Sequence, residues 1–288
     1  MGEVADPPFR RIAVVGLGLI GGSIAFAARR AWPSVHVVAI DREPVLKEAL
    51  ARRAIDAVAR DLSELRGVDL VVLAAPVRQN LSLLRRVAEH VSPQIVVTDV
   101  GGTKRAIVDA AAALVPPVTF VGGHPLGGGA RGGFEFATAG LFVRRPWIFT
   151  PHDASATNQV DRLSTFVAGL GALPSTMTAQ EHDRLMALIS HLPQLAATAL
   201  MEVVGRAAES GGLRMAGQGL VDTTRLASSP ADVWRDICVT NADEIRGALD
   251  LLIDRLSDLR SDLLRAEVID AAFDDAGRWR AELMKGRD

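Results

Sequence analysis

The first half of the chain alternates short apolar runs with segments of helical character. The runs are rich in β-branched residues and nearly continuous, as expected of strands that are buried on both faces of a sheet. This alternation predicts βαβ units and an α/β fold with a doubly wound, mostly parallel sheet. The expected strands cover residues 12–15, 35–40, 70–74, 95–98, 119–121 and 147–150, and the expected helices cover residues 23–31, 44–53, 78–89 and 104–114.

Helical patterns replace the alternation beyond about Asp153. One apolar stripe, with spacings of three and four residues, predicts a long helix that begins near Asn241 or Asp243. The chain is therefore expected to form an α/β domain over residues 1–153 and an all-α domain over residues 154–288. The stripe consists of Ile245, Leu249, Leu252, Leu256, Leu259 and Leu263, and it is larger than a small domain needs for its own core.

The composition excludes several classes of protein. Of the 288 residues, 49% are hydrophobic and 23% are charged, which indicates a globular chain, and the formal net charge of -2 offers no basic excess for nucleic acid. No uninterrupted apolar run approaches the ~20 residues of a membrane span, and the first residues lack a signal-peptide core. The single cysteine, Cys238, permits no internal disulfide and fits a reducing compartment. We expect a cytoplasmic protein without nucleic-acid or membrane partners.

A glycine motif follows the first expected strand. The sequence GLGLIG matches GxGxxG in the context that a dinucleotide site requires, between a strand and a helix, and so predicts a Rossmann-type domain. Gly16 permits a tight turn, Gly18 lets the backbone approach a pyrophosphate, and Gly21 allows the helix to pack closely on the strand. The phosphates are expected at the helix N-terminus, against Leu19 and Ile20.

Four further residues complete the expected cofactor cleft. Asp41 ends the second strand about 20 residues after the glycine motif, where an acid hydrogen-bonds the ribose 2′-hydroxyl of NAD. A turn aspartate is the alternative interpretation. Arg42 either covers the adenine or accommodates a 2′-phosphate, so NAD is the expected cofactor and NADP the alternative. Ala75 and Pro76, after the third strand, are expected to line the same cleft, although they also fit an ordinary strand exit.

Polar groups gather among glycines in three later stretches, TDVGGTK, GGHPLGGG and ISHLP. Asp99, in the first stretch, is expected to contact the cofactor. His124, in the second, follows a strand and is flanked by glycines that leave room for a ligand. An imidazole accepts a proton near neutral pH, as a dehydrogenase requires when a hydroxyl becomes a carbonyl. A structural histidine is the alternative, and no metal site is expected.

Together these stretches resemble the prephenate/arogenate dehydrogenase family. GxGxxG is shared by many dehydrogenases, but the combination of the other motifs is much narrower. The resemblance spans most of the chain, through VVGLGLIGGS (14–23), VVLAAPV (71–77), VTDVGGTK (97–104), GGHPLGG (122–128), ISHLPQ (189–194), DTTRLASS (222–229) and VWRDI (233–237).

The resemblance implies roles for individual residues. His124 matches the histidine that hydrogen-bonds the ring hydroxyl and assists its deprotonation, and His191 matches a second histidine at the substrate site. Arg225 matches an arginine that binds a substrate carboxylate, for which a planar guanidinium is suited. Without the resemblance, Arg225 would be interpreted as a surface residue or a partner of Asp222. Trp234 matches a tryptophan near the same pocket, and core packing is an equally good interpretation.

Two stretches depart from the family pattern. Gly102 replaces a serine that is hydrogen-bonded to the catalytic histidine, which leaves a glycine at a substrate-binding position. Gly129, Ala130 and Gly132 replace polar side chains after the histidine motif. These departures affect the groups around the reacting hydroxyl, and they leave the exact substrate open.

The function implied by the resemblance is that of a prephenate dehydrogenase. Such an enzyme oxidises and decarboxylates prephenate to 4-hydroxyphenylpyruvate with NAD⁺, in tyrosine biosynthesis, and family members are homodimers. Arogenate and 4-amino-4-deoxyprephenate are the alternative substrates. A sensor that binds NAD without catalysis is the alternative of another class, and the presence of His124, His191 and Arg225 together argues against it.

Overall fold

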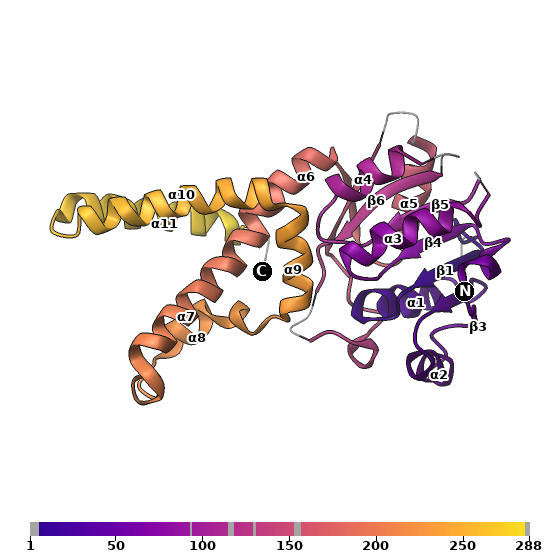
Figure 1. Cartoon of the computed structure of the whole chain (residues 1–288), viewed down its shortest axis with the longest axis horizontal. Coiled ribbons are helices and arrows are strands. Elements are labelled where there is room, and N and C mark those ends of the chain that lie inside the picture. Colours follow the sequence, from indigo (N-terminus) through magenta and orange to yellow (C-terminus); the bar gives the residue numbers. More distant parts are fainter. Residues whose placement is uncertain (1–5, 93, 115–117, 129–130, 153–156, 286–288) are drawn as a thin grey trace. The chain divides into compact units, whose positions relative to one another are not determined.

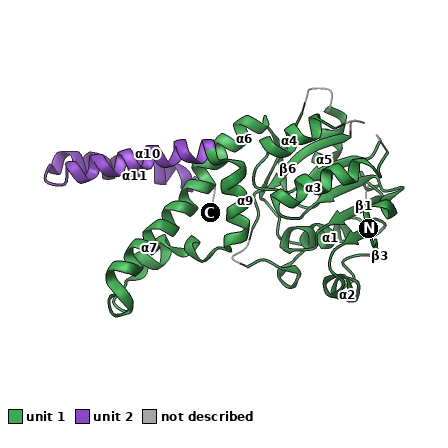
Figure 2. Cartoon of the chain, in the orientation of Figure 1, with its two compact units in different colours: residues 1–242 green, residues 243–288 purple. Residues whose placement is uncertain are grey.

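The computed structural model describes residues 6–92, 94–114, 118–128, 131–152 and 157–285. The chain divides into two compact units, Met1–Ala242 and Asp243–Asp288 (Figure 2). The first unit contains the sheet and the helices that follow it, and the second is a pair of helices.

An eight-stranded sheet organises the first unit (Figure 1). Its order is β3-β2-β1-β4-β5-β6-β7-β8, and every neighbouring pair is parallel except β6 and β7. The predicted fold class, a doubly wound and mostly parallel sheet followed by a helical region, is confirmed. The strands are β1 (Arg11–Val15), β2 (His36–Ile40), β3 (Ala57–Val58), β4 (Leu70–Leu73), β5 (Val96–Asp99), β6 (Thr119–Pro125), β7 (Pro146–Pro151) and β8 (Leu173–Thr176).

Each face of the sheet carries its own hydrophobic core. In β1, Ile12 and Val14 belong to one core and Ala13 and Val15 to the other, because successive side chains of a strand point to opposite faces. This explains why the strands read as continuous apolar runs. The first core is covered by α1 (Leu19–Ala31), α2 (Glu43–Ala51), α5 (Thr157–Gly169) and η2 (Phe134–Phe136), and the second by α3 (Val77–Ala88), α4 (Arg105–Ala112) and η1 (Leu62–Leu65).

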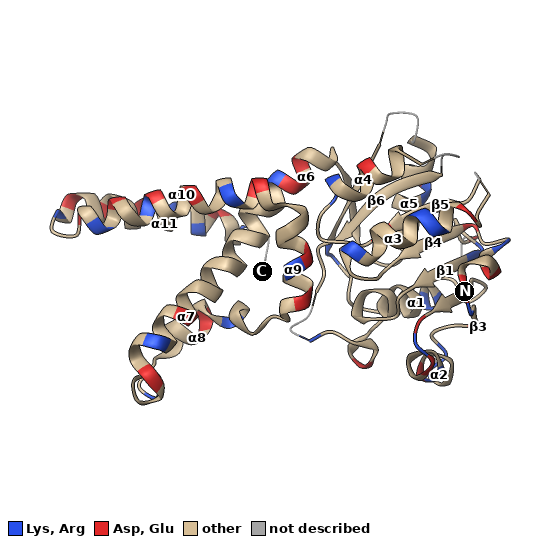
Figure 3. Cartoon of the chain, in the orientation of Figure 1, with Lys and Arg blue, Asp and Glu red and all other residues tan. Residues whose placement is uncertain are grey.

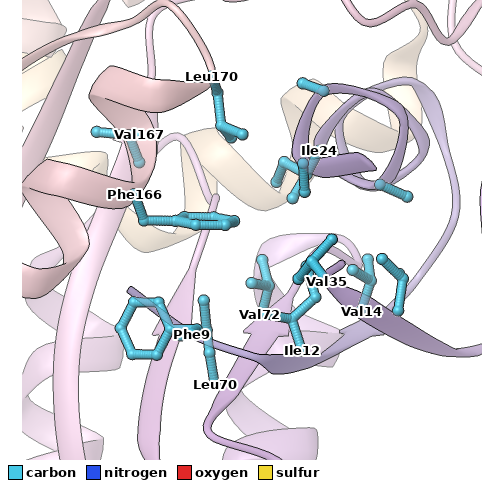
Figure 4. Close-up of a cluster of buried hydrophobic side chains, with 14 of the residues drawn as sticks. Phe9, Ile12, Val14, Ile24, Val35, Leu70, Val72, Phe166, Val167 and Leu170 are labelled. Atoms are coloured by element: carbon cyan, nitrogen blue, oxygen red, sulfur yellow. The ribbon is translucent and has the colours of Figure 1, made fainter. Parts of the chain in front are cut away.

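Aromatic rings join α5 to the first core (Figure 4). The ring of Phe166 stacks on Trp32, with centroids 5.6 Å apart, and meets Phe9 edge-on at 5.8 Å. Ile24 and Leu70 belong to the same cluster and are fully buried. The cluster therefore ties α5 to α1 and to the centre of the sheet.

The sheet extends beyond residue 153, which corrects the domain boundary predicted there. Strand β8 pairs in parallel with β7, and α5 buries Leu163, Phe166 and Val167. The change from strands to helices therefore falls after Thr176. The sequence pattern missed β8 because all four of its residues are exposed, so it has no apolar run.

A helix interrupted by one wide turn begins the helical region. It consists of α6 (Ala179–Met186), the π-helical turn η4 (Ala187–His191) and α7 (Leu192–Leu213). A capping box between Thr178 and Glu181 starts it. Pro193 lacks an N–H, and its ring would clash with the carbonyl four residues earlier, which accounts for the departure from α-helical geometry. The remaining elements of this unit are α8 (Gln218–Thr223), η5 (Arg225–Ser228) and α9 (Ala231–Thr240).

The second unit leaves large apolar side chains exposed. The predicted long helix is α10 (Ala242–Ser261), which is followed by α11 (Ala266–Met284). Phe273 and Trp279 of α11 are 75% and 74% exposed. Charges of both signs are interspersed along the two helices (Figure 3), so the unit has no surface of a single sign. The predicted apolar stripe is exposed in part, at Leu256 and Leu263.

Replacing Phe166 by alanine should strongly destabilise the first unit. The change removes a buried ring that contacts two other rings, and such substitutions cost about 3–5 kcal/mol. Leu173→Ala, at an exposed position of β8, is the control and should cost less than about 1 kcal/mol. The free energies of unfolding come from urea titrations followed by circular dichroism. Equal small losses for the two variants would contradict the assignment of this core.

Candidate functional site

The glycine motif forms a tight loop between β1 and α1. Gly16 has a φ of +100°, and a Cβ there would lie 2.8 Å from the Ala74 carbonyl oxygen. At Gly21 a Cβ would lie 1.9 Å from the Gly16 carbonyl oxygen, so both positions require glycine. At Gly18 nothing lies within 4 Å of an added Cβ. The loop is therefore closed on the protein side and open at Gly18, as backbone that receives a phosphate must be.

The other predicted cofactor residues lie around this loop. Helix α1 begins at Leu19, so the free N–H groups of its first turn, including Ile20, belong to the loop. Asp41 accepts hydrogen bonds from the backbone N–H groups of Leu17 (2.5 Å) and Arg42 (2.6 Å), which fixes its carboxylate beside the loop. The Arg42 side chain is 86% exposed.

Ala75 and Pro76 leave the sheet beside the glycine loop, where the backbone nitrogen of Ala75 would lie 3.0 Å from a Cβ on Gly16. Both follow β4, which pairs with β1, and Ala74 donates its N–H to Val15 at 2.8 Å. Strand order reverses between these two strands, and this is where open α/β sheets bind ligands. Asn80 accepts from the Ala75 N–H at 3.1 Å and so holds this exit in place. These residues therefore gather at the position in the sheet where such folds bind dinucleotides.

Asp99 does not face this position with its side chain, which differs from the cofactor contact predicted for it. It is buried, and its carboxylate accepts from the N–H groups of Gly101 (2.8 Å) and Gly123 (3.1 Å). The same carboxylate forms an ion pair with Lys104 at 2.5 Å. Its polar atoms are thus committed to the protein interior, where they join the end of β5 to β6.

Lys104 is the residue of the TDVGGTK stretch whose role the sequence did not reveal. Its ammonium group is fully buried and also donates to the Gly123 carbonyl oxygen at 2.8 Å. Burial lowers the pKa of Lys104 from its usual value, and the charge of Asp99 opposes that shift. The pair therefore places a fixed, desolvated charge next to His124.

Asp183 of α6 is a second buried carboxylate. It accepts from the N–H groups of Lys104 (2.7 Å) and Arg105 (3.0 Å), and from Arg105 Nε at 3.3 Å. It also accepts from His182 Nδ1 at 2.8 Å. Burial favours the neutral acid, but these hydrogen bonds outweigh it and hold the pKa of Asp183 below its usual value. Asp183 thereby attaches α6 to the start of α4, and Figure 1 shows the two helices side by side.

His124 lies at the end of β6 and faces α6. Its Nδ1 is 2.8 Å from Nε2 of His182, and the two rings meet edge to face at 5.1 Å. His124 is half-buried, whereas His182 is fully buried. His124, His182 and Asp183 thus form a hydrogen-bonded series that leads from the site into the protein.

The π-helical turn brings His191 to the same side as His182. Nine positions separate the two residues, about two and a half turns of an uninterrupted α-helix, which would place them on opposite faces. The extra residue of the π turn rotates His191 back by about 100°. Its Nδ1 lies 3.3 Å from the amide nitrogen of Asn241, which donates to the Asp183 carbonyl oxygen at 2.8 Å. Trp234 meets the His191 ring edge-on at 6.0 Å.

Burial lowers the pKa of all three histidines and so favours their neutral forms. Burial lowers the pKa of His124 well below its usual value, and the charges of His182, Lys104 and His191 act in the same direction. Burial also lowers the pKa of His182, against the hydrogen bond to Asp183. For His191 burial lowers the pKa to about 4. A neutral imidazole has one nitrogen without a proton. Both nitrogens of His182 are engaged, with Asp183 and His124, whereas His124 has a second ring nitrogen beyond its bond to His182.

Gly102 lies where α9 approaches the ends of the strands. A Cβ on Gly102 would lie 3.3 Å from Ile237, and the hydroxyls of Thr103 and Thr240 are 2.7 Å apart. The site therefore has room for little more than a methyl group at Gly102. The departures at Gly129 and Ala130 lie outside the described residues, while Gly132 has nothing within 4 Å of an added Cβ.

Arg225 is exposed on η5, which α7 holds in place. Gln194 donates to the Leu226 carbonyl oxygen at 2.7 Å and accepts from Ser229 at 3.1 Å. Gln194 comes three residues after His191, so Arg225 belongs to a segment fixed next to that histidine. Within the described ranges Arg225 has no ion pair, and Asp222 instead accepts from Gln218. The alternative of an Asp222–Arg225 pair is therefore wrong.

Several residues of this site were not predicted. They are Lys104, His182, Asp183 and Asn241, which connect the predicted residues to one another. The adjacent His182 and Asp183, just after a capping box, were the available signal. Two polar residues in a helix usually face solvent, and only their partners across the chain reveal that they are buried.

Comparisons with known proteins identify the family. The model of the prephenate dehydrogenase nucleotide-binding domain matches residues 24–174, and that of the prephenate dehydrogenase dimerization domain matches residues 178–271. This chain belongs to the prephenate dehydrogenase family. The first matched region ends within β8 and the second begins at residue 178, so the boundary between them lies close to the end of the sheet at Thr176.

Individual relatives agree with this assignment. The chain is 34% identical to the prephenate dehydrogenase of Bacillus subtilis (strain 168) over 256 residues, which are 87% of this chain and 69% of that protein. Prephenate dehydrogenase from A. aeolicus, solved with hydroxyphenyl propionate and NAD⁺, has a TM-score of 0.86 and 26% identity, over 95% of this chain and 98% of that one. Arogenate dehydrogenase from Synechocystis has a TM-score of 0.80 and 28% identity, over 94% and 99%.

The stability of this family member should fall as the pH decreases below 6.5. His191 has a pKa of about 4 in the folded chain and its usual 6.5 when unfolded, so the unfolded chain binds more protons between these values. The stabilisation present above pH 6.5 is lost through this window, by about 3 kcal/mol for this group alone. Urea unfolding between pH 7 and pH 4.5 measures it.

The variant His191→Gln should have a shallower pH dependence than the parent chain, because it lacks this group. His152→Gln removes an exposed histidine and should keep the parent dependence. Parallel curves for the parent and His191→Gln would mean that His191 titrates alike in the folded and unfolded chains.

Proposed function

We propose that this chain is an NAD-dependent prephenate dehydrogenase, which oxidises and decarboxylates prephenate to 4-hydroxyphenylpyruvate in tyrosine biosynthesis. The observation that carries the proposal is the neutral imidazole of His124, at the end of β6 in the sheet that forms the dinucleotide crevice and hydrogen-bonded to His182. Membership of the family and the similarity to the B. subtilis enzyme support it. The protein acts as a cytoplasmic enzyme on a small dianionic substrate.

The crevice residues hold the cofactor. The glycine loop and the first turn of α1 receive the pyrophosphate, and Asp41 hydrogen-bonds the adenosine ribose. The fixed carboxylate of Asp41 disfavours a 2′-phosphate by charge repulsion, so NAD is preferred over NADP. Bound NAD⁺ supplies the hydride acceptor. In the A. aeolicus relative a complex with NAD⁺ has been solved, which supports the same cofactor here.

His124 acts as the catalytic base. It removes the proton from the ring hydroxyl as the carbon that carries this hydroxyl loses a hydride. Loss of CO₂ then breaks a carbon–carbon bond, and its electron pair passes through the ring to the new carbonyl oxygen. The proton returns from His124 to that oxygen and completes the phenol. The base therefore ends the reaction in the state in which it began, and no proton has to leave the site.

Arg225, His191 and Trp234 bind the substrate. The exposed guanidinium of Arg225 is suited to a bidentate contact with a carboxylate. His191 and Trp234, which contact each other, form a wall of the pocket at the π-helical turn. Gly102 lacks the hydroxyl that the family pattern supplies as a serine, and Ile237 would lie only 3.3 Å from a Cβ there. Because the missing hydroxyl alters the surroundings of the reacting hydroxyl, arogenate and 4-amino-4-deoxyprephenate are the substrates to compare.

The helical region forms a homodimer. It matches the family's dimerization domain, and its exposed apolar side chains include Leu256, Phe273 and Trp279. The helix Ala179–Leu213 is also long and apolar enough to cross a membrane by length and composition. That helix carries the buried His182 and Asp183 of the site, so a second protein copy is a better partner for its apolar surface than lipid.

Purified enzyme should reduce NAD⁺ with prephenate, followed at 340 nm, at a higher rate than with arogenate, 4-amino-4-deoxyprephenate or NADP⁺. The variant His124→Asn should lower kcat by about 10²- to 10⁴-fold, because a general base contributes that much. His152→Asn is the control, since it removes a histidine outside the site, and it should keep the parent rate. Absence of NADH with all three substrates would leave a dinucleotide-binding protein and refute the proposed activity.

Light scattering should give a particle of twice the chain mass of 30.6 kDa. Leu256→Asp places a charge on the exposed apolar side of α10 and should shift the particle toward the single-chain mass. Leu50→Asp, at an exposed position of α2, is the matched control and should leave the mass unchanged. A parent protein of single-chain mass would exclude the homodimer.

A further inference from the structure

The hydrogen bonds of His124, His182 and Asp183 determine which ring nitrogens of the two histidines carry a proton. Asp183 accepts from the N–H groups of Lys104 and Arg105, and an ionised carboxylate has no proton to donate. Its remaining neighbour, His182 Nδ1 at 2.8 Å, must therefore be the donor. In a neutral imidazole the other nitrogen, Nε2, is then a bare acceptor.

The same reasoning extends to His124. The bare Nε2 of His182 lies 2.8 Å from Nδ1 of His124, and one proton has to lie between two nitrogens at this distance. That proton belongs to His124 Nδ1, which leaves His124 Nε2 without a proton. Among the described residues, His182 is the hydrogen-bond partner of the His124 ring, and Gly102 contributes no side chain.

We propose that His182 and Asp183 are positioning residues that hold His124 in the single tautomer whose Nε2 accepts the substrate proton. The proposal rests on the function proposed above. In this arrangement the buried carboxylate determines the protonation of two imidazoles in series. When Nε2 takes the proton, the Nδ1–H of the resulting imidazolium still donates to His182, and the negative charge of Asp183 stabilises the cation through that ring.

The charged groups around His124 and His182 determine how stable the His124 cation is. Positive charge on His182, Lys104 or His191 disfavours a cation at His124, so His182 supports that cation only while it is itself neutral and accepts from Nδ1. Asp183 and Asp99 favour positive charge at His182, and Lys104 opposes it. The charge of Asp99 is balanced by its ion pair with Lys104. When His124 takes up a proton, the stabilising negative charge is therefore that of Asp183, which also pairs with Arg105. Removing His182 would separate His124 from this stabilising charge.

The variants His182→Phe and His182→Gln test the proposal. Phenylalanine keeps the ring but offers no acceptor, so kcat should fall by about 100-fold while KM changes by less than about threefold. The acidic limb of kcat/KM should move to lower pH, because the His124 cation loses its partner. Glutamine has a side-chain oxygen that can accept from Nδ1, so it should recover most of the lost rate. Met186→Leu, buried one turn later on α6, is the packing control and should keep the parent profile.

Nitrogen NMR of the free enzyme gives a readout that needs no turnover. In ¹⁵N-labelled parent protein, the signals that disappear in His124→Asn should report a protonated Nδ1 and a bare Nε2. In His182→Phe this preference should be lost. A parent His124 with its proton on Nε2 would overturn the proposal.

Two kinetic outcomes would also overturn it. One is an unchanged kcat in His182→Phe. The other is a lower kcat without a shifted pH profile and without recovery in His182→Gln, which would make His182 a packing residue. If the parent enzyme lacked activity with every substrate while NMR gave the expected tautomer, the proposed function would fail and the tautomer assignment would stand.

Discussion

The ion pair between Lys104 and Asp99 is the interaction on which the rest of the site depends. Both groups are buried beneath the ends of β5 and β6, and the backbone N–H next to the lysine side chain holds Asp183 of the distant helix α6. The sheet and the helical region are thus joined through two neighbouring ion pairs, Lys104 with Asp99 and Arg105 with Asp183, whose carboxylates are buried. Removing one partner of such a pair leaves an uncompensated charge and costs about 3–5 kcal/mol. His124 lies against His182 because this set of charges keeps strand and helix in contact.

The sequence predicted the parts of this molecule whose signals are local. The glycine loop, the strands buried on both faces, and the fold class all follow from residues within a few positions of one another. The motifs also predicted that His191 and Trp234 lie near one pocket, and the two rings are in contact, whereas the roles of His124, His191 and Trp234 at a substrate site stay predictions. Strand β8 was missed because an exposed edge strand needs no apolar residues. A cofactor contact was predicted for Asp99 and no role for His182, because the burial of their side chains depends on partners such as Gly123 and His124 that lie far away along the chain.

Burial of the site favours the form of the imidazoles that the proposed proton transfer requires. Burial holds His124, His182 and His191 in their neutral forms, so no proton has to be lost before the reaction begins. The same burial makes each of them a weaker base, since it disfavours the cation. A base that only has to hold a proton while CO₂ departs, and then returns it, does not need to be strong. The electrostatics of the site therefore suit a reaction in which the base takes up a proton and later returns it to the product.

The π-helical turn has a consequence for how this segment can change in evolution. The angle between His182 and His191 depends on the number of residues between them and hardly on which residues they are. A substitution in that stretch alters packing by degrees, and neighbouring side chains can adapt to it. Deleting or inserting one residue would turn His191 by about 100°, away from Asn241 and Trp234, with no intermediate state. Divergent descendants of this chain can thus change the exposed residues between the two histidines, but Asp183 and the length of the segment have to be kept.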